Sequence, residues 1–199
     1  VETLVNVLSI VKDGGAAYAA LGTEGSKGRK LFCLSGAVAK PGIYEVEFGI
    51  TLRQLIDLGG GMRGGSTMQA ILLGGAAGGF VGPNDLDLPL TMEATRAAGS
   101  SLGSGVVMVL DQSVDMVDQL RRIAAFFRDE SCGQCVPCRV GTVRQEEIVS
   151  RLAKGVQSQD IELLRELGTV MRDASICGLG QTANSAIDSA INKLKVFAV

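Results

Sequence analysis

Four of the five cysteines in this chain form a pattern that links two distant segments. Cys132, Cys135 and Cys138 lie at intervals of three in ESCGQCVPCRVGT, and Cys177 follows much later in SICGLG. The chain contains no histidine, which removes imidazole from any metal site and also removes the commonest general base. The fold must therefore bring the triple and the single cysteine together if they act as one ligand set.

The spacing of the triple favours an iron–sulfur cluster over other uses of cysteine. A tight triple can place three thiolates on three irons of a cubane, and one distant thiolate then completes the set. A structural zinc site more often uses two separated C-x2–4-C pairs, and zinc remains the alternative for the same four cysteines. Disulfides are disfavoured because the N-terminus carries no signal peptide or twin-arginine leader, and we expect a reducing compartment.

Several residues near the triple have expected roles. Gly133 permits a tight loop, and Pro137 fixes the turn into Cys138. Arg139 has two open interpretations: a positive charge beside the cluster that favours its reduced state, or an exposed arginine. We expect solvated side chains for the arginines of the preceding helix, Arg121, Arg122 and Arg128.

The fifth cysteine, Cys33, is expected outside the site. It lies in the apolar run LFCL, where a free cysteine most often behaves as a small buried hydrophobe.

Composition and charge exclude two classes of partner. The net charge is −2 and the basic residues are scattered, so nucleic-acid binding is not expected. Apolar runs such as residues 70–73 and 106–110 are far shorter than the roughly 20 residues of a membrane helix. We therefore expect a cytoplasmic protein that is soluble or peripheral within a complex, without direct membrane insertion.

The first half of the chain is glycine-rich and predicts a small sheet with one helix. Residues 30–38 and 43–46 read as a hairpin-like pair around the turn at Lys40-Pro41-Gly42. Residues 51–58 predict a short helix capped by Thr51, with Leu52, Leu55 and Ile56 on its apolar face. Further buried strands are expected at residues 70–73, 79–81 and 106–110.

The second half predicts a four-helix bundle. Ser113 is the expected N-cap of a helix whose apolar residues recur at spacings of three and four as far as Phe127. Further helices are expected at about residues 142–152, 158–170 and 182–194, joined by short links. The predicted fold class is therefore α+β, a small sheet domain followed by a helical one.

A glycine motif in the first half matches the residue spacing of a dinucleotide-binding fingerprint but not its expected secondary structure. Gly59, Gly61 and Gly64 fit G-x-G-x-x-G, and Asp85 lies about 20 residues further on. The glycines follow a helical pattern instead of a strand, and no helix is expected after them. Like the stretch GGAAGGF at residues 74–80, they are interpreted as turns.

The cysteine motifs together resemble a known family. ESCGQCVPCRVGT with a remote SICGLG is similar to the C-terminal, cluster-binding part of the flavin-containing, NADH-oxidising subunit of respiratory complex I. The same unit recurs in NAD-dependent formate dehydrogenases and NAD-reducing hydrogenases. LSGAVAKPGIYEVEFGITLRQLI resembles the SLBB β-grasp domain of that subunit, and VETLVNV resembles the end of its N-N-V-E-T-L segment.

The resemblance implies a division of the chain and a ligand set. Residues 1–28 would be a linker from a flavin and NADH domain that precedes Val1, residues 29–110 an SLBB β-grasp-like domain, and residues 111–199 a helical [4Fe-4S]-binding domain. It implies that Cys132, Cys135, Cys138 and Cys177 bind the cluster. No catalytic residue is assigned to the chain, and Thr3 is not assigned to the flavin.

The resemblance also implies cofactors and partners outside these residues. FMN and NAD(H) would be bound by the full-length subunit, so the chain would be part of an NAD(H)-linked oxidoreductase. Its partners would be a ferredoxin-like [2Fe-2S] subunit and a large iron–sulfur or catalytic subunit. The ending GQTANSAIDSAINKLKVF looks more like the β subunit of an NAD-dependent formate dehydrogenase than the complex I form.

Overall fold

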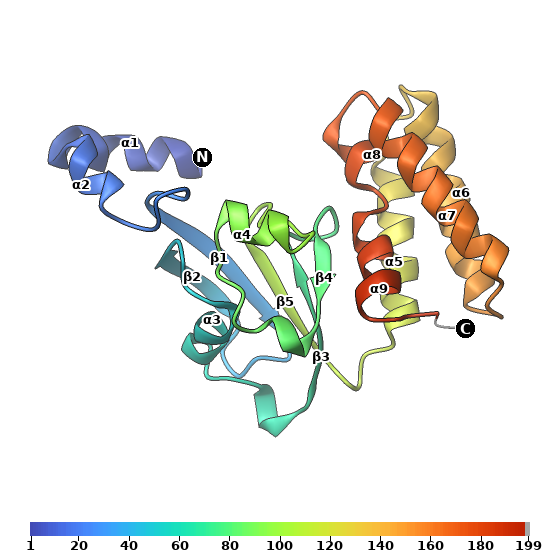
Figure 1. Ribbon diagram of the computed structural model, residues 1–199, viewed down its shortest axis with the longest axis horizontal. Helices are drawn as coiled ribbons and strands as arrows, with labels where there is room; N and C mark the ends of the chain where they lie inside the picture. The colour runs from blue at the N-terminus through green and yellow to red at the C-terminus, as the bar shows by residue number, and fades with distance from the viewer. Residues whose placement is uncertain (198–199) are drawn as a thin grey trace. The chain divides into compact units, whose positions relative to one another are not determined.

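The strands of the chain form a mixed sheet within its first 111 residues (Figure 1). The computed structural model describes residues 1–197. The sheet has the order β2-β1-β5-β3-β4, in which β1 pairs antiparallel with β2 and parallel with β5, and β5 pairs antiparallel with β3. Its members are β1 (Arg29–Gly36), β2 (Gly42–Glu47), β3 (Met68–Leu73), β4 (Gly79–Val81) and β5 (Val106–Asp111). The predicted hairpin and the three further strands are thus confirmed.

The alternation of β1 sends an unexpected set of side chains inward. Phe32 and Leu34 are buried, as is Lys30, whereas Leu31 and Cys33 are exposed. The prediction that Cys33 is a buried hydrophobe is therefore wrong. Successive strand residues face opposite sides, so burying the larger Phe32 and Leu34 turns Cys33 outward.

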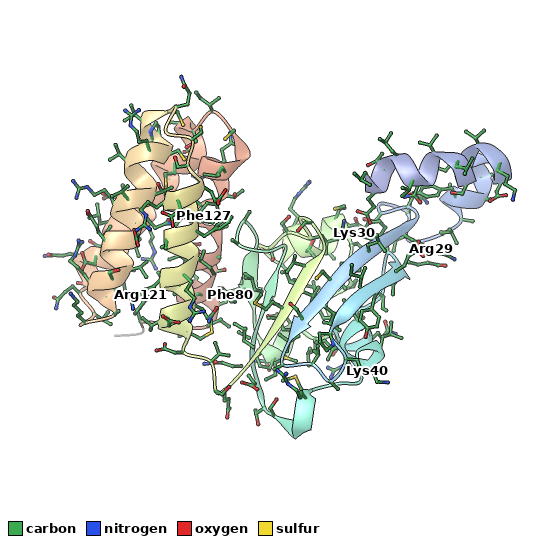
Figure 2. The ribbon with its side chains drawn as sticks, turned by 180° about the vertical axis from the view of Figure 1, so that it is seen from behind. Arg29, Lys30, Lys40, Phe80, Arg121 and Phe127 are labelled. Atoms are coloured by element: carbon green, nitrogen blue, oxygen red, sulfur yellow. The ribbon has the colours of Figure 1, made fainter. Side chains whose placement is uncertain are left out.

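Lys30, which is labelled in Figure 2, is buried, and the side-chain carboxylate of Glu2 neutralises its charge. Its Nζ lies 3.1 Å from Glu2 Oε2, and the backbone N–H of Leu31 donates to Glu2 Oε1 at 2.8 Å. Partial burial acts to raise the pKa of Glu2, but these two hydrogen bonds and the Lys30 charge outweigh burial and lower that pKa.

The predicted helix after β2 is confirmed as α3 (Leu52–Leu58). Thr51 caps it: its hydroxyl accepts from the backbone N–H of Gln54 at 3.2 Å, and the Gln54 side chain accepts from the Thr51 N–H at 2.9 Å. Leu52, Leu55 and Ile56 are buried, as their spacing predicted.

The first unit also contains short helices that the sequence did not predict, before β1 and between the strands. Residues 1–28, predicted as a linker, contain two helices, and the first of them exposes apolar side chains such as Leu4, Leu8 and Val11. These additional elements are α1 (Glu2–Asp13), α2 (Gly15–Ala19), the 3-10 turns η1 (Arg63–Gly65) and η2 (Pro83–Asp85), and α4 (Met92–Ala97).

The second half is helical, as predicted. The expected segments correspond to α5 (Met116–Glu130), α6 (Val136–Leu152), α7 (Ser158–Ala174) and α9 (Ser185–Lys193), with a short extra helix α8 (Gly178–Thr182). The N-cap of α5 is Asp115 instead of Ser113, because the Asp115 carboxylate accepts from the N–H groups of Val117 at 2.9 Å and Asp118 at 3.3 Å. α6 begins six residues earlier than predicted, inside the cysteine motif.

The chain divides into two compact units. The first comprises Val1–Gly75 and Gly82–Asp111, and the second comprises Ala76–Val81 together with the chain from Gln112 onward, of which residues 198–199 lie outside the described range. Phe80 and Phe127, both labelled in Figure 2, are fully buried large side chains of the second unit. β4 joins this unit through α9, where the Phe80 N–H donates to Ser189 Oγ at 2.7 Å.

Among residues 1–197, no helix has both the length and the hydropathy that a membrane crossing requires.

Candidate functional site

The cysteine triple occupies the connection between α5 and α6. α5 ends at Glu130, and Gly133 turns the chain with a φ of +73°, a left-handed conformation that glycine adopts without strain. Cys135 is the N-cap of α6, and Pro137 is its second residue, where the missing N–H costs no helical hydrogen bond. Cys138 therefore lies in the first turn of α6, with its backbone fixed by the helix.

The remote cysteine reaches the same pocket from the connection between α7 and α8. α7 ends at Ala174, and Cys177 is the N-cap of α8. Cys132, Cys135, Cys138 and Cys177 all line a single pocket of about 270 Å³. The other residues lining this pocket are Glu130, Ser131, Gln134, Ile176 and Leu179. The structure thus brings together the four residues that the sequence singled out and leaves Cys33 outside.

The four cysteines around one pocket offer a ligand set for a metal-containing group. Within residues 1–197, no three His, Cys, Asp or Glu side chains converge closely enough to hold a single metal ion. A tetrahedral zinc with Zn–S bonds of about 2.3 Å would need sulfurs only about 3.8 Å apart. A cubane spreads its four thiolates over four irons, and the four cysteines around this pocket could supply them.

The thiols differ in their exposure to solvent. Cys138 is buried and Cys135 is half-buried, whereas Cys132 and Cys177 are exposed. A group held by all four would therefore rest against the protein on the Cys138 side and approach solvent on the Cys132 and Cys177 side.

Hydrogen bonds hold the loop around the buried thiol. Ser131 Oγ lies 3.2 Å from Cys138 Sγ and accepts from the backbone N–H of Gly133 at 3.3 Å. Arg139 Nη1 donates to the Gly133 carbonyl at 2.7 Å. Arg139 is exposed, and its hydrogen bond to the Gly133 carbonyl stabilises the loop that carries Cys132.

The half-buried thiol is electrostatically prepared for the thiolate form. The backbone N–H group of Ile176, and to a smaller extent that of Cys138, favours the charged form of the Cys135 thiol and lowers its pKa, although Cys135 makes no side-chain capping hydrogen bond to α6. The hydroxyl of Ser175 contributes to the same lowering, although its geometry does not amount to a full hydrogen bond. Ser175 is itself buried and belongs to the segment that leads to Cys177.

Close packing at Gly180 joins the two cysteine-bearing segments. A Cβ atom on Gly180 would lie 2.3 Å from Ser175 Oγ and 2.9 Å from Cys138 Cβ, distances that real Cβ atoms do not adopt. Only glycine lets α8 approach Cys138 this closely. No sequence pattern pointed to Ser131, Ser175 or Gly180, because their importance arises from contacts between segments.

The arginines of α5 behave largely as the sequence suggested. Arg122 pairs with Asp118 at 2.8 Å in an exposed i,i+4 ion pair, and Arg128 pairs with Asp129 at 2.8 Å and with Glu146 on α6. None of these side chains lines the cysteine pocket.

The glycine motif of the first half is confirmed as turns. Gly59 ends α3, Gly61 and Gly64 have φ values of +74° and +60°, and only the three-residue η1 follows. The sequence context that nucleotide binding needs, a strand before the glycines and a helix after them, is therefore lacking here.

Two family models match the chain. The NADH-ubiquinone oxidoreductase-F iron-sulfur binding region matches residues 118–196, and the SLBB domain matches residues 31–79. The first covers all four pocket cysteines, and the second begins within β1 and extends past β3.

Similar proteins are subunits of NAD(P)-linked oxidoreductases. The chain is 38% identical to the HndC subunit of the NADP-reducing hydrogenase of Solidesulfovibrio fructosivorans over 96% of its own length and 40% of that protein. It is 38% identical to the F-type subunit of the NADH-quinone oxidoreductase of Mycobacterium bovis over 98% of its own length and 44% of that protein. The chain thus spans less than half the length of these relatives.

The fold is also found in a solved structure. A chain of the NAD+-reducing [NiFe]-hydrogenase in the H2-reduced state matches with a TM-score of 0.87 and 37% identity, covering 98% of this chain and 33% of that one. The air-oxidised state of the enzyme matches with a TM-score of 0.88.

Proposed function

Because the chain belongs with the C-terminal part of the F-type subunit of NADH-ubiquinone oxidoreductase and its relatives, where an SLBB domain accompanies an iron–sulfur binding region, we propose that it is an electron relay. It holds one [4Fe-4S] cluster on Cys132, Cys135, Cys138 and Cys177. The observation that carries this proposal is the convergence of these four side chains on one pocket.

The residues of the pocket have distinct tasks in this proposal. When bound, the cluster accepts and releases single electrons, and four thiolate ligands leave no iron open for catalysis. Cys138 anchors it against the core of the helical unit, and the lowered pKa of Cys135 favours the thiolate that iron requires. The exposed Cys132 and Cys177 mark the side on which an electron partner can approach.

The proposal extends to the intact subunit, of which this chain supplies part. FMN and NAD(H) would bind outside these residues, and hydride chemistry at the flavin would feed single electrons to the cluster. The receiving partners would be a ferredoxin-like [2Fe-2S] subunit and a large iron–sulfur or catalytic subunit. Its relatives are subunits of hydrogenases and of NADH-quinone oxidoreductases, which supports this arrangement.

The finer assignment is to an NAD-dependent formate dehydrogenase, and it rests on the C-terminal sequence GQTANSAIDSAINKLKVF. The test is to purify the intact complex and to measure NAD+ reduction with formate and with H2, and NADH oxidation with quinone. Formate-dependent activity supports this assignment; activity with H2 or quinone alone moves the chain to the other branches and leaves the relay proposal intact.

Iron analysis of the intact subunit tests the relay. We expect about four irons and four sulfides per chain and an EPR signal on reduction, as one cubane requires. Cys177→Ser should lower the iron content and weaken or alter the signal, whereas the matched control Cys33→Ser should change neither. About two irons per chain, or none after anaerobic preparation, would refute the proposal.

A zinc-binding interaction module is the second candidate function for the same thiols. It predicts one zinc per chain and no redox signal in protein prepared anaerobically with iron supplied. The two candidates share the same four cysteines around one pocket, so the metal content and the redox signal decide between them.

A further inference from the structure

A serine directly before the cysteine triple contacts the buried thiol. Ser131 is the C-cap residue of α5, and its Oγ lies 3.2 Å from Cys138 Sγ. The same oxygen accepts a hydrogen bond from the Gly133 N–H at 3.3 Å. The hydroxyl thus links the turn of the loop to the one pocket cysteine that is buried.

The direction of the Ser131–Cys138 bond follows from the chemistry of both atoms. A hydroxyl offers one donor and two acceptor positions, and the Gly133 N–H uses one of the acceptors. A cysteine that ligates iron is a thiolate, which carries no proton and can only accept. The Ser131 hydroxyl must therefore donate to Cys138 Sγ whenever the cluster is bound.

We propose, on the basis of the relay function above, that Ser131 is a positioning residue that raises the reduction potential of the cluster through its hydrogen bond to Cys138 Sγ. Reduction adds one electron to the cluster and increases the negative charge on its sulfurs. A hydrogen-bond donor stabilises this more negative state better than the oxidised one. Cys138 is only 6% exposed, so water screens the effect little.

A purely structural role for Ser131 makes a different prediction. The loop is also held by Arg139, whose guanidinium donates to the Gly133 carbonyl at 2.7 Å independently of Ser131. If Ser131 served only to order the loop, removing its hydroxyl would change stability or iron content while the retained cluster kept its potential. The potential therefore separates the two roles.

The experiment is an EPR-monitored redox titration of the intact subunit with dithionite and mediators. The electron comes from dithionite, and no bond to iron is made or broken. We expect Ser131→Ala to lower the potential, making the reduction equilibrium threefold to tenfold less favourable; tenfold is about 59 mV for one electron. Ser131→Thr, which keeps the hydroxyl, should stay close to the wild type.

The control is Ser158→Ala, at an exposed serine that begins α7 and does not line the cysteine pocket. It should leave the potential unchanged. An unchanged or raised potential in Ser131→Ala overturns the proposal, as does a Ser131→Thr variant that shifts as far as the alanine variant.

Loss of the cluster in Ser131→Ala would call for Ser131→Gly as a second variant without the hydroxyl. If neither variant retains iron, Ser131 is a structural residue and the proposal is wrong. Iron and sulfide analysis of the wild type keeps this outcome separate from a failure of the relay function, since it asks only whether the cubane is present.

Discussion

Replacing Gly180 by alanine should push apart the two segments that carry the pocket cysteines. The new Cβ would lie 2.3 Å from Ser175 Oγ, 2.6 Å from Ser175 Cβ and 2.9 Å from Cys138 Cβ, whereas ordinary contact begins at 3.4 Å. Rotating the serine hydroxyl would relieve only the first of these clashes. The backbone must therefore separate α8 from Cys138, by about half an ångström at the cysteine and more at Ser175.

The expected cost is about 1–3 kcal/mol of unfolding free energy, the usual range for overpacking a tight site. The roughly 0.5–1 kcal/mol that alanine gains over glycine inside a helix offsets part of this cost, and a net loss of stability is expected. Because α8 follows Cys177 directly, the same displacement separates Cys177 from Cys138. Iron content should fall together with stability.

Gly178→Ala provides the matched control for Gly180→Ala. Gly178 lies in the same short helix, and nothing lies within 4 Å of a Cβ built on it. Urea unfolding and iron analysis of both variants should find Gly178→Ala close to the wild type and Gly180→Ala reduced in both. Equal behaviour of the two variants would refute the packing argument.

Three further changes test the packing, capping and charge contacts described above. Phe127→Ala should lower the free energy of urea unfolding by about 3–5 kcal/mol, because the Phe127 side chain is only 1% exposed. Its half-exposed neighbour Phe126 should tolerate alanine far better. Similar losses at both positions would contradict the assigned burial. Thr51→Ala should cost about 1 kcal/mol through loss of the cap of α3, measured in the same way, and no loss would mean that the capping box contributes little. Glu2→Gln should destabilise the protein at pH 7. A carboxylate whose pKa is lowered by folding stabilises the protein above its ordinary pKa and loses that effect when it is protonated. The difference in stability between Glu2→Gln and the wild type should therefore shrink as the pH falls below about 4.3. A pH-independent difference in thermal unfolding would show that the Glu2 charge is not responsible.

Local signals predicted much of the fold. The hairpin and α3 follow from periodicity, a Pro-Gly turn and the Thr51 cap, and each is completed by residues within a short stretch of chain. The helical unit follows from apolar spacing alone, although α6 begins earlier because Pro137 fits the first turn of a helix as well as it fits a loop.

The misplaced residues depend on contacts that the sequence does not reveal. Cys33 faces outward because Phe32 and Leu34 take the inner face, and the alternation alone does not say which face is inner. Lys30 can be buried only because Glu2, far away in sequence, supplies its counter-charge.

The same division holds for the site. The four cysteines could be identified from their spacing and from the family resemblance, since ligand types and intervals carry their own chemistry. Ser131, Ser175 and Gly180 could not, because a serine or glycine gains meaning at the site only when the two cysteine-bearing segments meet.

The position of the pocket has a consequence for the stability of the helical unit. The packed helices α6 and α7 carry the chain from Cys138 to Cys177, with 38 residues between the two cysteines. The proposed cluster would tie the two ends of this hairpin like a cross-link. By the loop-closure estimate used for disulfides, a tie of this length contributes about 4 kcal/mol against unfolding. Loss of the cluster would then remove this contribution and lower the stability of the helical unit.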